Sequence, residues 1–215
     1  MRLPLLALAL LLAVPASAQV AVLEPVDEAA QDPSFLLFRA RLLEAAQARD
    51  TAFVLSVLDP DVRVSFGADN GVDGFRRRWL RGMNPDDLWT TLTRTLALGS
   101  TYERAEDGTR TATAPYVFGA WPDTLDAFEH LAVIGERVRV RAAPHADAAT
   151  LTTLTYHVVP TLYDPNLPET WRRVTLADGR TGYVAASYLR SPIDYRLGLV
   201  KQGTEWRVRY FVAGD

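Results

Sequence analysis

The sequence predicts an α+β protein with a helix-rich N-terminal domain, a small β-barrel and a C-terminal β-hairpin. Three observations lead to this fold class. Apolar residues recur at spacings of three and four through most of residues 32–99, the period of a helix buried on one side. Beyond residue 128 they occur in short alternating runs separated by turn residues, as in small barrels. Residues 192–215 contain two further alternating runs on either side of one turn, which predicts a hairpin.

The composition is that of an ordinary globular protein and excludes several kinds of chemistry. The chain has 215 residues, of which 48% are hydrophobic, and none is cysteine. Disulfides, thiolate metal sites and cysteine nucleophiles are therefore excluded. There are 26 acidic and 23 basic residues, a formal net charge of -3. This balance lacks the basic surplus of nucleic-acid-binding proteins, so no nucleic-acid partner is expected.

Residues 1–18 have the pattern of a secretory signal peptide. Arg2 precedes an apolar run, and Ala16-Ser17-Ala18 supplies a small-residue cleavage site before Gln19. The apolar run is shorter than the roughly 20 residues that span a bilayer core. We expect cleavage near Ala18–Gln19, a periplasmic or secreted location, and no transmembrane segment after cleavage. Residues 19–31 lack clear periodicity and are interpreted as a linker.

Local signals for helices support the helix-rich domain, which we assign to residues 32–128. Asp32-Pro33 pairs a capping side chain with a proline suited to the first helical turn, and Asn84-Pro85 repeats the device. Asp50 can cap a shorter second helix. Between them, Val62 to Phe66 alternates with polar residues and predicts one strand.

Residues 129–191 carry the signals of the barrel, and residues 192–215 those of the hairpin. Val138 and Val140 alternate with arginines, and Asp178-Gly179 favours a tight turn between two later strands. In the hairpin, Trp206 begins the second alternating run after the Gln202-Gly203 turn. Because an isolated hairpin is marginally stable in water, we expect it to dock the barrel onto the helical domain.

Residues 131–189 resemble a bacterial SH3 domain (SH3b). The resemblance is carried by the segments Val138–His145, Trp171–Val174, Asp178–Val184 and Ser187–Leu189. It implies an SH3-like β-barrel that binds cell-wall peptides. The segments Phe35–Trp79 and Arg190–Asp215 are similar to parts of exported bacterial proteins in which an uncharacterised helical domain precedes SH3b.

The resemblance also implies a ligand-binding site. A shallow groove for peptide stems or glycans could be lined by three aromatic residues, Trp171, Tyr183 and Tyr188. Arg141 is the fourth predicted ligand-binding residue. Packing inside the barrel is the alternative role for the three aromatic side chains. Arg139 stands where the family usually has asparagine, which leaves the ligand preference open.

No pattern in the sequence defines a catalytic or metal site. His130, His145 and His157 fall in no metal-binding spacing, and the usual hydrolase and nucleotide-binding motifs are missing. We therefore expect no catalytic residue, metal or cofactor. The candidate carboxylates for a glycosidase-type site are Asp50, Asp61, Asp69 and Asp73. The basic run Arg76–Arg78 could hold an anionic polymer or form a solvated helix face.

These observations predict a non-catalytic binding protein of the bacterial envelope. The expected partner is peptidoglycan stem peptide or an envelope protein. Two alternatives stay open: a carboxylate-dependent cell-wall hydrolase targeted by its SH3b module, and a scaffold or inhibitor that acts through the hairpin around Trp206.

Overall fold

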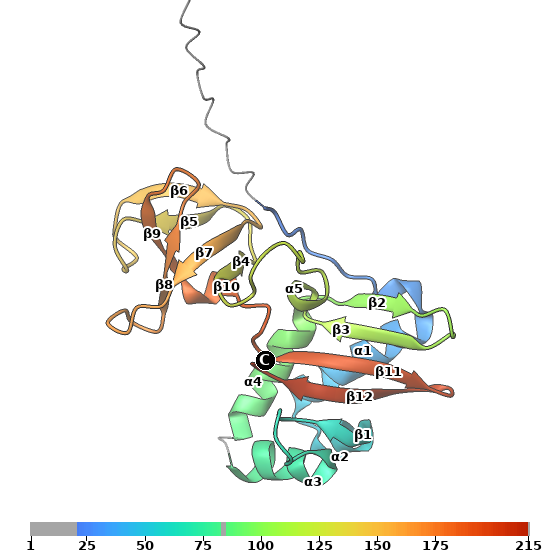
Figure 1. The fold of residues 1–215 in the computed structure, drawn as a ribbon. Helices are drawn as coiled ribbons and strands as arrows, with labels where there is room; N and C mark the ends of the chain where they lie inside the picture. The colour runs from blue at the N-terminus through green and yellow to red at the C-terminus, as the bar shows by residue number, and fades with distance from the viewer. Residues whose placement is uncertain (1–20, 83–84, 215) are drawn as a thin grey trace, which may run out of the picture.

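The fold is mostly β, built around two open sheets (Figure 1). The computed structural model describes residues 21–82 and 85–214, so the predicted signal peptide lies outside the described residues. That part of the chain contains twelve strands and five α-helices, and 29% of its residues are helical. The predicted helix-rich N-terminal domain is therefore wrong. Residues 33–97 do contain helices, but these helices pack against a sheet whose strands come from residues 58–63, 101–114 and 196–212.

The first sheet has five strands, in the order β1-β12-β11-β3-β2. The strands are β1 (Leu58–Arg63), β2 (Thr101–Arg104), β3 (Arg110–Ala114), β11 (Arg196–Gln202) and β12 (Glu205–Val212). β1 pairs with β12 in parallel, and the other neighbours are antiparallel. The C-terminal hairpin thus lies in the middle of this sheet, with β3 on one side and β1 on the other. The first sheet and the helices that pack on it, here called the first unit, therefore combine residues 33–114 with the C-terminal hairpin.

Helices α1 (Pro33–Ala48) and α4 (Pro85–Ala97) belong to this unit and pack against each other. Asp32 caps α1 as predicted, because its carboxylate accepts hydrogen bonds from the backbone N–H groups of Ser34 and Phe35. Asp50 caps α2 (Thr51–Ser56) by accepting from Phe53 N at 2.9 Å. The remaining helices are short: α3 (Gly71–Phe75), a π-helix η2 (Arg76–Gly82), α5 (Tyr116–Gly119), and two 3-10 turns, η1 (Ala29–Gln31) and η3 (Ala186–Tyr188).

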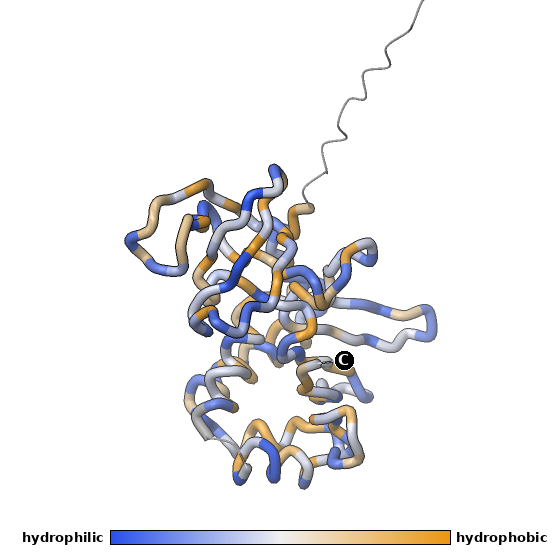
Figure 2. The backbone as a smooth tube through the Cα atoms, turned by 60° about the vertical axis from the view of Figure 1, so that its left-hand side comes forward, coloured by the Kyte–Doolittle hydropathy of each residue, from blue (hydrophilic) through white to orange (hydrophobic). Residues whose placement is uncertain are grey.

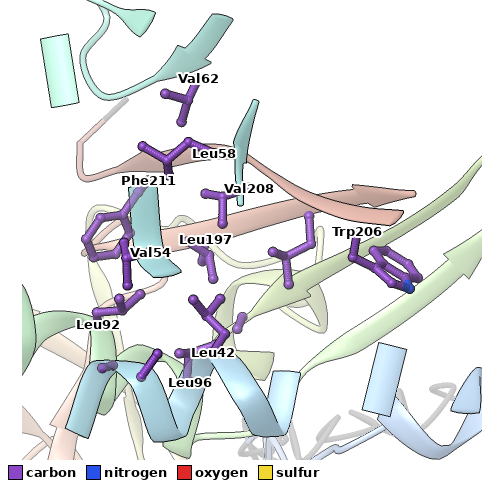
Figure 3. Close-up of a cluster of buried hydrophobic side chains, with 14 of the residues drawn as sticks. Leu42, Val54, Leu58, Val62, Leu92, Leu96, Leu197, Trp206, Val208 and Phe211 are labelled. Atoms are coloured by element: carbon purple, nitrogen blue, oxygen red, sulfur yellow. The ribbon is translucent and has the colours of Figure 1, made fainter. Parts of the chain in front are cut away.

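A single hydrophobic core fills the space between the helices and the first sheet. Figure 3 shows Leu42 of α1 directed toward Leu197 and Val208 of the hairpin. Beside them, the Trp79 ring lies 5.0 Å from the ring of Phe211, between centroids. The aromatic face of the hairpin is therefore buried against the helices, and burial of these large rings is a main source of stability for the unit.

The second sheet has seven strands, in the order β10-β4-β7-β8-β9-β5-β6. The strands are β4 (His130–Val133), β5 (Val138–Arg141), β6 (Thr150–Leu154), β7 (Val158–Leu162), β8 (Trp171–Thr175), β9 (Thr181–Ala185) and β10 (Leu189–Arg190). Figure 2 shows hydrophobic and hydrophilic positions interspersed along the chain, and buried side chains of this sheet form one core. The edge strands β6 and β10 do not pair, so the predicted SH3-like closed barrel is wrong.

The N-terminal segment pairs with the backbone at the start of β7. Leu23 N donates to Tyr156 O at 2.7 Å, and Val158 N donates to Ala21 O at 2.8 Å. On its other edge, β7 pairs with β4. Residues 21–23 therefore add a short backbone pairing to the second sheet at residues 156–158.

The same N-terminal segment also reaches the first sheet. Glu28 N donates to Ser100 O at 2.9 Å, and the Glu28 carboxylate accepts from Tyr102 N of edge strand β2 at 2.8 Å. Between the two contact regions, Leu23 belongs to an apolar cluster with α5 and the second sheet. Residues 21–31, in the segment interpreted as a linker, thus bind both sheets.

Two leucines of helix α1, one buried and one exposed, allow the packing of the first core to be tested with the same Leu→Ala change. Leu42 is 0% exposed and Leu37 is 71% exposed on the same helix. Leu42→Ala should lower the free energy of unfolding by about 2–5 kcal/mol, because it leaves a cavity under the hairpin. Leu37→Ala should change it by about 0.5 kcal/mol or less. Urea denaturation followed by circular dichroism measures both, and equal effects would contradict this packing.

Candidate functional site

The candidate site lies on the outer face of the second sheet, across strands β5, β9 and β8. Val140, Val174 and Val184 point into the core of this sheet. Side chains alternate between the two faces of a strand, so their sequence neighbours point outward. The backbone register then brings outward residues into two rows, Arg141–Tyr183–Arg173 and Ala185–Trp171.

A glycine allows these strands to lie close together. A Cβ on Gly182 would come within 2.3 Å of Val140 Cγ1, which is closer than any real contact. Gly182 therefore permits β9 to pack against β5 and fixes the position of Tyr183, the next residue along the strand.

Three of the four predicted ligand-binding residues line one hollow of about 660 Å³ on this face: Trp171, Tyr188 and Arg141. Tyr183 does not line it. The Tyr183 side chain is half-buried on β9, between its cross-strand neighbours Arg141 and Arg173. The hollow also includes side chains that we did not predict, namely Glu136, Arg137, Arg139, Ala146 and Thr153. Two of these, Arg137 and Arg139, add positive charge.

The hollow combines exposed aromatic surface with a surplus of positive charge. Tyr188 is 52% exposed, and Trp171 is partly exposed. The Arg141 guanidinium donates to neutral acceptors, Ala148 O at 2.9 Å and Thr150 Oγ1 at 3.1 Å. The guanidinium groups of Arg137 and Arg139 have no acceptor among the described residues.

Glu136 is the acidic residue of this wall, so three guanidinium groups face one carboxylate. Its Oε1 accepts a hydrogen bond from the Tyr156 hydroxyl at 3.4 Å. Guanidinium groups bind carboxylates and phosphates through paired hydrogen bonds, and aromatic rings stack on flat or apolar groups. The hollow therefore has the chemistry to hold an anionic ligand that also offers a surface for stacking.

The four candidate carboxylates do not gather at this hollow. Asp50 caps α2, and Asp73 pairs with Arg76 at 3.2 Å. Asp69 pairs with Arg77, and the hydrogen bond from that guanidinium lowers the pKa of the Asp69 carboxyl. Asp61 is exposed on β1. The roles seen for Asp50, Asp69 and Asp73 are a helix cap and surface ion pairs.

Two of the three histidines share a different hollow. His130 and His157 line a space of about 530 Å³ between β6, β7 and the β8–β9 turn, whereas His145 is exposed elsewhere. Across residues 21–82 and 85–214, no three His, Asp or Glu side chains lie close enough together to hold a metal ion.

A serine–lysine contact occurs at the start of α1. Ser34 Oγ accepts hydrogen bonds from Lys201 Nζ at 2.6 Å and from Trp206 Nε1 at 3.0 Å, and donates to Asp32 Oδ1 at 2.6 Å. Such pairs act as nucleophile and base in some hydrolases. Here the hydroxyl hydrogen is directed at Asp32, whose carboxylate lies 3.6 Å from Lys201 Nζ and 3.2 Å from the Arg110 guanidinium. We interpret the cluster as a structural link between α1, β3 and the hairpin.

Asp32 is held in its ionised form by this cluster. Burial raises the pKa of its carboxyl, but hydrogen bonds from the Ser34 hydroxyl and from the backbone of Ser34 and Phe35 outweigh burial. With the charge of Lys201, they lower the pKa to about 2. The Ser34 hydroxyl donates to this carboxylate and accepts from Lys201 and Trp206, so its hydrogen bonds are used within the cluster.

No protein-family model, curated protein or solved structure matches this chain in the comparisons. The resemblance to SH3b therefore stays a proposal. Among the described residues, no helix has both the length and the apolar character needed to cross a membrane.

The Asp32 cluster predicts a specific loss of stability in acid. The folded pKa of about 2 lies below the ordinary value of 3.8, so the ionised carboxylate stabilises the fold above pH 3.8. By linkage this stabilisation is about 2 kcal/mol and is lost as the pH falls from 3.8 through about 2. Asp32→Asn should therefore flatten the dependence of unfolding free energy on pH in this range.

Chemical denaturation at a series of acidic pH values measures this effect. Asp123→Asn, at an exposed position outside this cluster, is the matched control and should retain the wild-type dependence. The assignment of Asp32 is contradicted if both variants lose stability in acid as steeply as the wild type.

Proposed function

We propose that this chain is a non-catalytic binding protein of the bacterial envelope, and that the hollow around Trp171 binds peptidoglycan stem peptide. One observation carries the proposal: Arg137, Arg139 and Arg141 converge on a hollow that also exposes Trp171 and Tyr188. Stem peptides are short and extended and carry several carboxylates, so they offer groups for both the arginines and the rings.

Two further features support a ligand from the bacterial cell wall. The pattern of residues 1–18 supports export, and the segments between Val138 and Leu189 resemble a family that binds cell-wall peptides. Binding is favoured over hydrolysis because Asp50, Asp69 and Asp73 are engaged as a helix cap and in surface ion pairs.

The hairpin is a poor candidate for a partner-binding surface. Trp206 is 4% exposed, and both edges of the hairpin pair with other strands of the first sheet. A partner could reach Trp206 only by opening the core. We therefore do not propose the scaffold or inhibitor role for it.

A titration with defined peptide tests the proposed function. The chain lacking residues 1–18 should bind a synthetic stem tetrapeptide (L-Ala, D-Glu, diaminopimelate, D-Ala) saturably at low salt in isothermal titration calorimetry. Arg139→Gln should weaken binding about 5- to 30-fold, because a charged hydrogen bond to a carboxylate is worth about 1–2 kcal/mol in a partly exposed groove. Tyr188→Ala should also weaken it, through loss of stacking.

Arg104→Gln is the matched control. Arg104 is an exposed arginine on edge strand β2 of the other sheet, with no side-chain partner in the described chain. This variant should bind the tetrapeptide as the wild type does. The proposal fails if the wild type neither binds the peptide saturably nor co-sediments with purified sacculi above a control protein.

A further inference from the structure

A second hollow lies directly beyond Trp171. It has a volume of about 1010 Å³, and Trp171 and Ala185 form part of its wall as well as of the first hollow. Other lining residues come from outside the second sheet: Arg94 of α4 in the first unit, and Ser191 and Asp194 of the segment that returns to the first sheet. Figure 1 shows the C-terminal end of α4 directed toward the seven-stranded sheet. Trp171 thus stands between a hollow on one sheet and a hollow between the two sheets.

The charged groups of the second hollow leave a positive surplus. Arg94 has no side-chain partner among the described residues. The Arg172 guanidinium donates to two backbone carbonyl groups, Glu169 O at 2.7 Å and Trp171 O at 2.9 Å, which are neutral. Asp194 is already paired with the buried Arg190 at 2.8 Å. The guanidinium groups of Arg94 and Arg172 therefore have no ion pair among the described residues. They share the hollow with one carboxylate that is also outside an ion pair, that of Glu169.

Packing fixes the end of α4 that carries Arg94. Leu92 and Leu96, on either side of it in the helix, are buried in the first core. Next to Arg94, the Thr95 hydroxyl donates to Tyr195 O at 3.4 Å, which ties the helix to the returning segment. Burial lowers the pKa of Arg190, the paired Asp194 carboxylate raises it, and the charge of Arg94 lowers it, so the two guanidinium groups lie close enough to repel. An anion between the two sheets would relieve this repulsion.

We infer that the ligand groove continues past Trp171 into this second hollow and that Arg94 is a ligand-binding residue contributed by the other unit. The inference rests on the proposed function and specifies its ligand as an extended peptide with carboxylates at two separated positions. One carboxylate meets the arginines of β5 and its preceding turn. The chain crosses Trp171, and the second carboxylate meets Arg94 and Arg172.

Peptides of two lengths test the two halves of the groove separately. The stem tetrapeptide is long enough to carry carboxylates on both sides of Trp171, whereas the dipeptide L-Ala–D-Glu occupies only the first hollow. The wild type should therefore bind the tetrapeptide more tightly than the dipeptide. Arg94→Gln should weaken tetrapeptide binding about 5- to 10-fold and leave dipeptide binding unchanged. Arg139→Gln should weaken binding of both peptides.

Controls keep a failure of this inference distinct from a failure of the proposed function. Arg94→Lys retains the charge and should retain most of the tetrapeptide affinity, while Arg104→Gln should bind both peptides normally. Circular dichroism and urea denaturation verify that each variant is folded. If Arg94→Gln binds the tetrapeptide like the wild type while Arg139→Gln binds it weakly, the second half of the groove is overturned and the first stands. If the wild type binds neither peptide, both are overturned.

Discussion

The position of the C-terminal hairpin is the constraint on which the rest of the structure depends. β11 and β12 lie between β3 and β1, so the first sheet is incomplete until the last residues of the chain return to it. These pairings join residues far apart in sequence, which is costly in chain entropy and slow to form. Burial of Phe211 and Trp206 under α1 and α4 offsets that cost, and the hydrogen bonds from Lys201 and Trp206 to Ser34 fix the hairpin against the helix.

The return of the chain also fixes the candidate site. Residues 115–129 lead from the first sheet to the second, residues 191–195 lead back, and residues 21–31 contact both sheets. A shared apolar cluster around Leu23, Tyr116 and Val158 lies between them. The hollow between the sheets is therefore bounded by packed elements, and Arg94 and Trp171 both line it. A ligand that binds both hollows would contact both units without ordering a loop, which lowers the entropic cost of binding.

Local features of the fold could be predicted from the sequence, and long-range ones could not. The starts of α1 and α2 followed from Asp32 and Asp50, because capping depends on residues within one turn. The parallel pairing of β1 with β12 has no local signal. Nor does the contact of residues 21–23 with residues 156–158, or the separation of the edge strands β6 and β10 that leaves the predicted barrel open. In the site, Arg139 could have been found from the alternation around Val138 and Val140. Arg94 could not, because its helix reaches Trp171 only through the tertiary fold.

The position of a bound peptide tests this view of the molecule most directly. A crystal structure of the chain lacking residues 1–18 with the stem tetrapeptide should show the peptide in the hollow beside Arg139 and Tyr188, passing over Trp171. One of its carboxylates should lie within hydrogen-bond distance of the Arg94 guanidinium. A peptide bound elsewhere, for example in the hollow lined by His130 and His157, would contradict the assignment of the site.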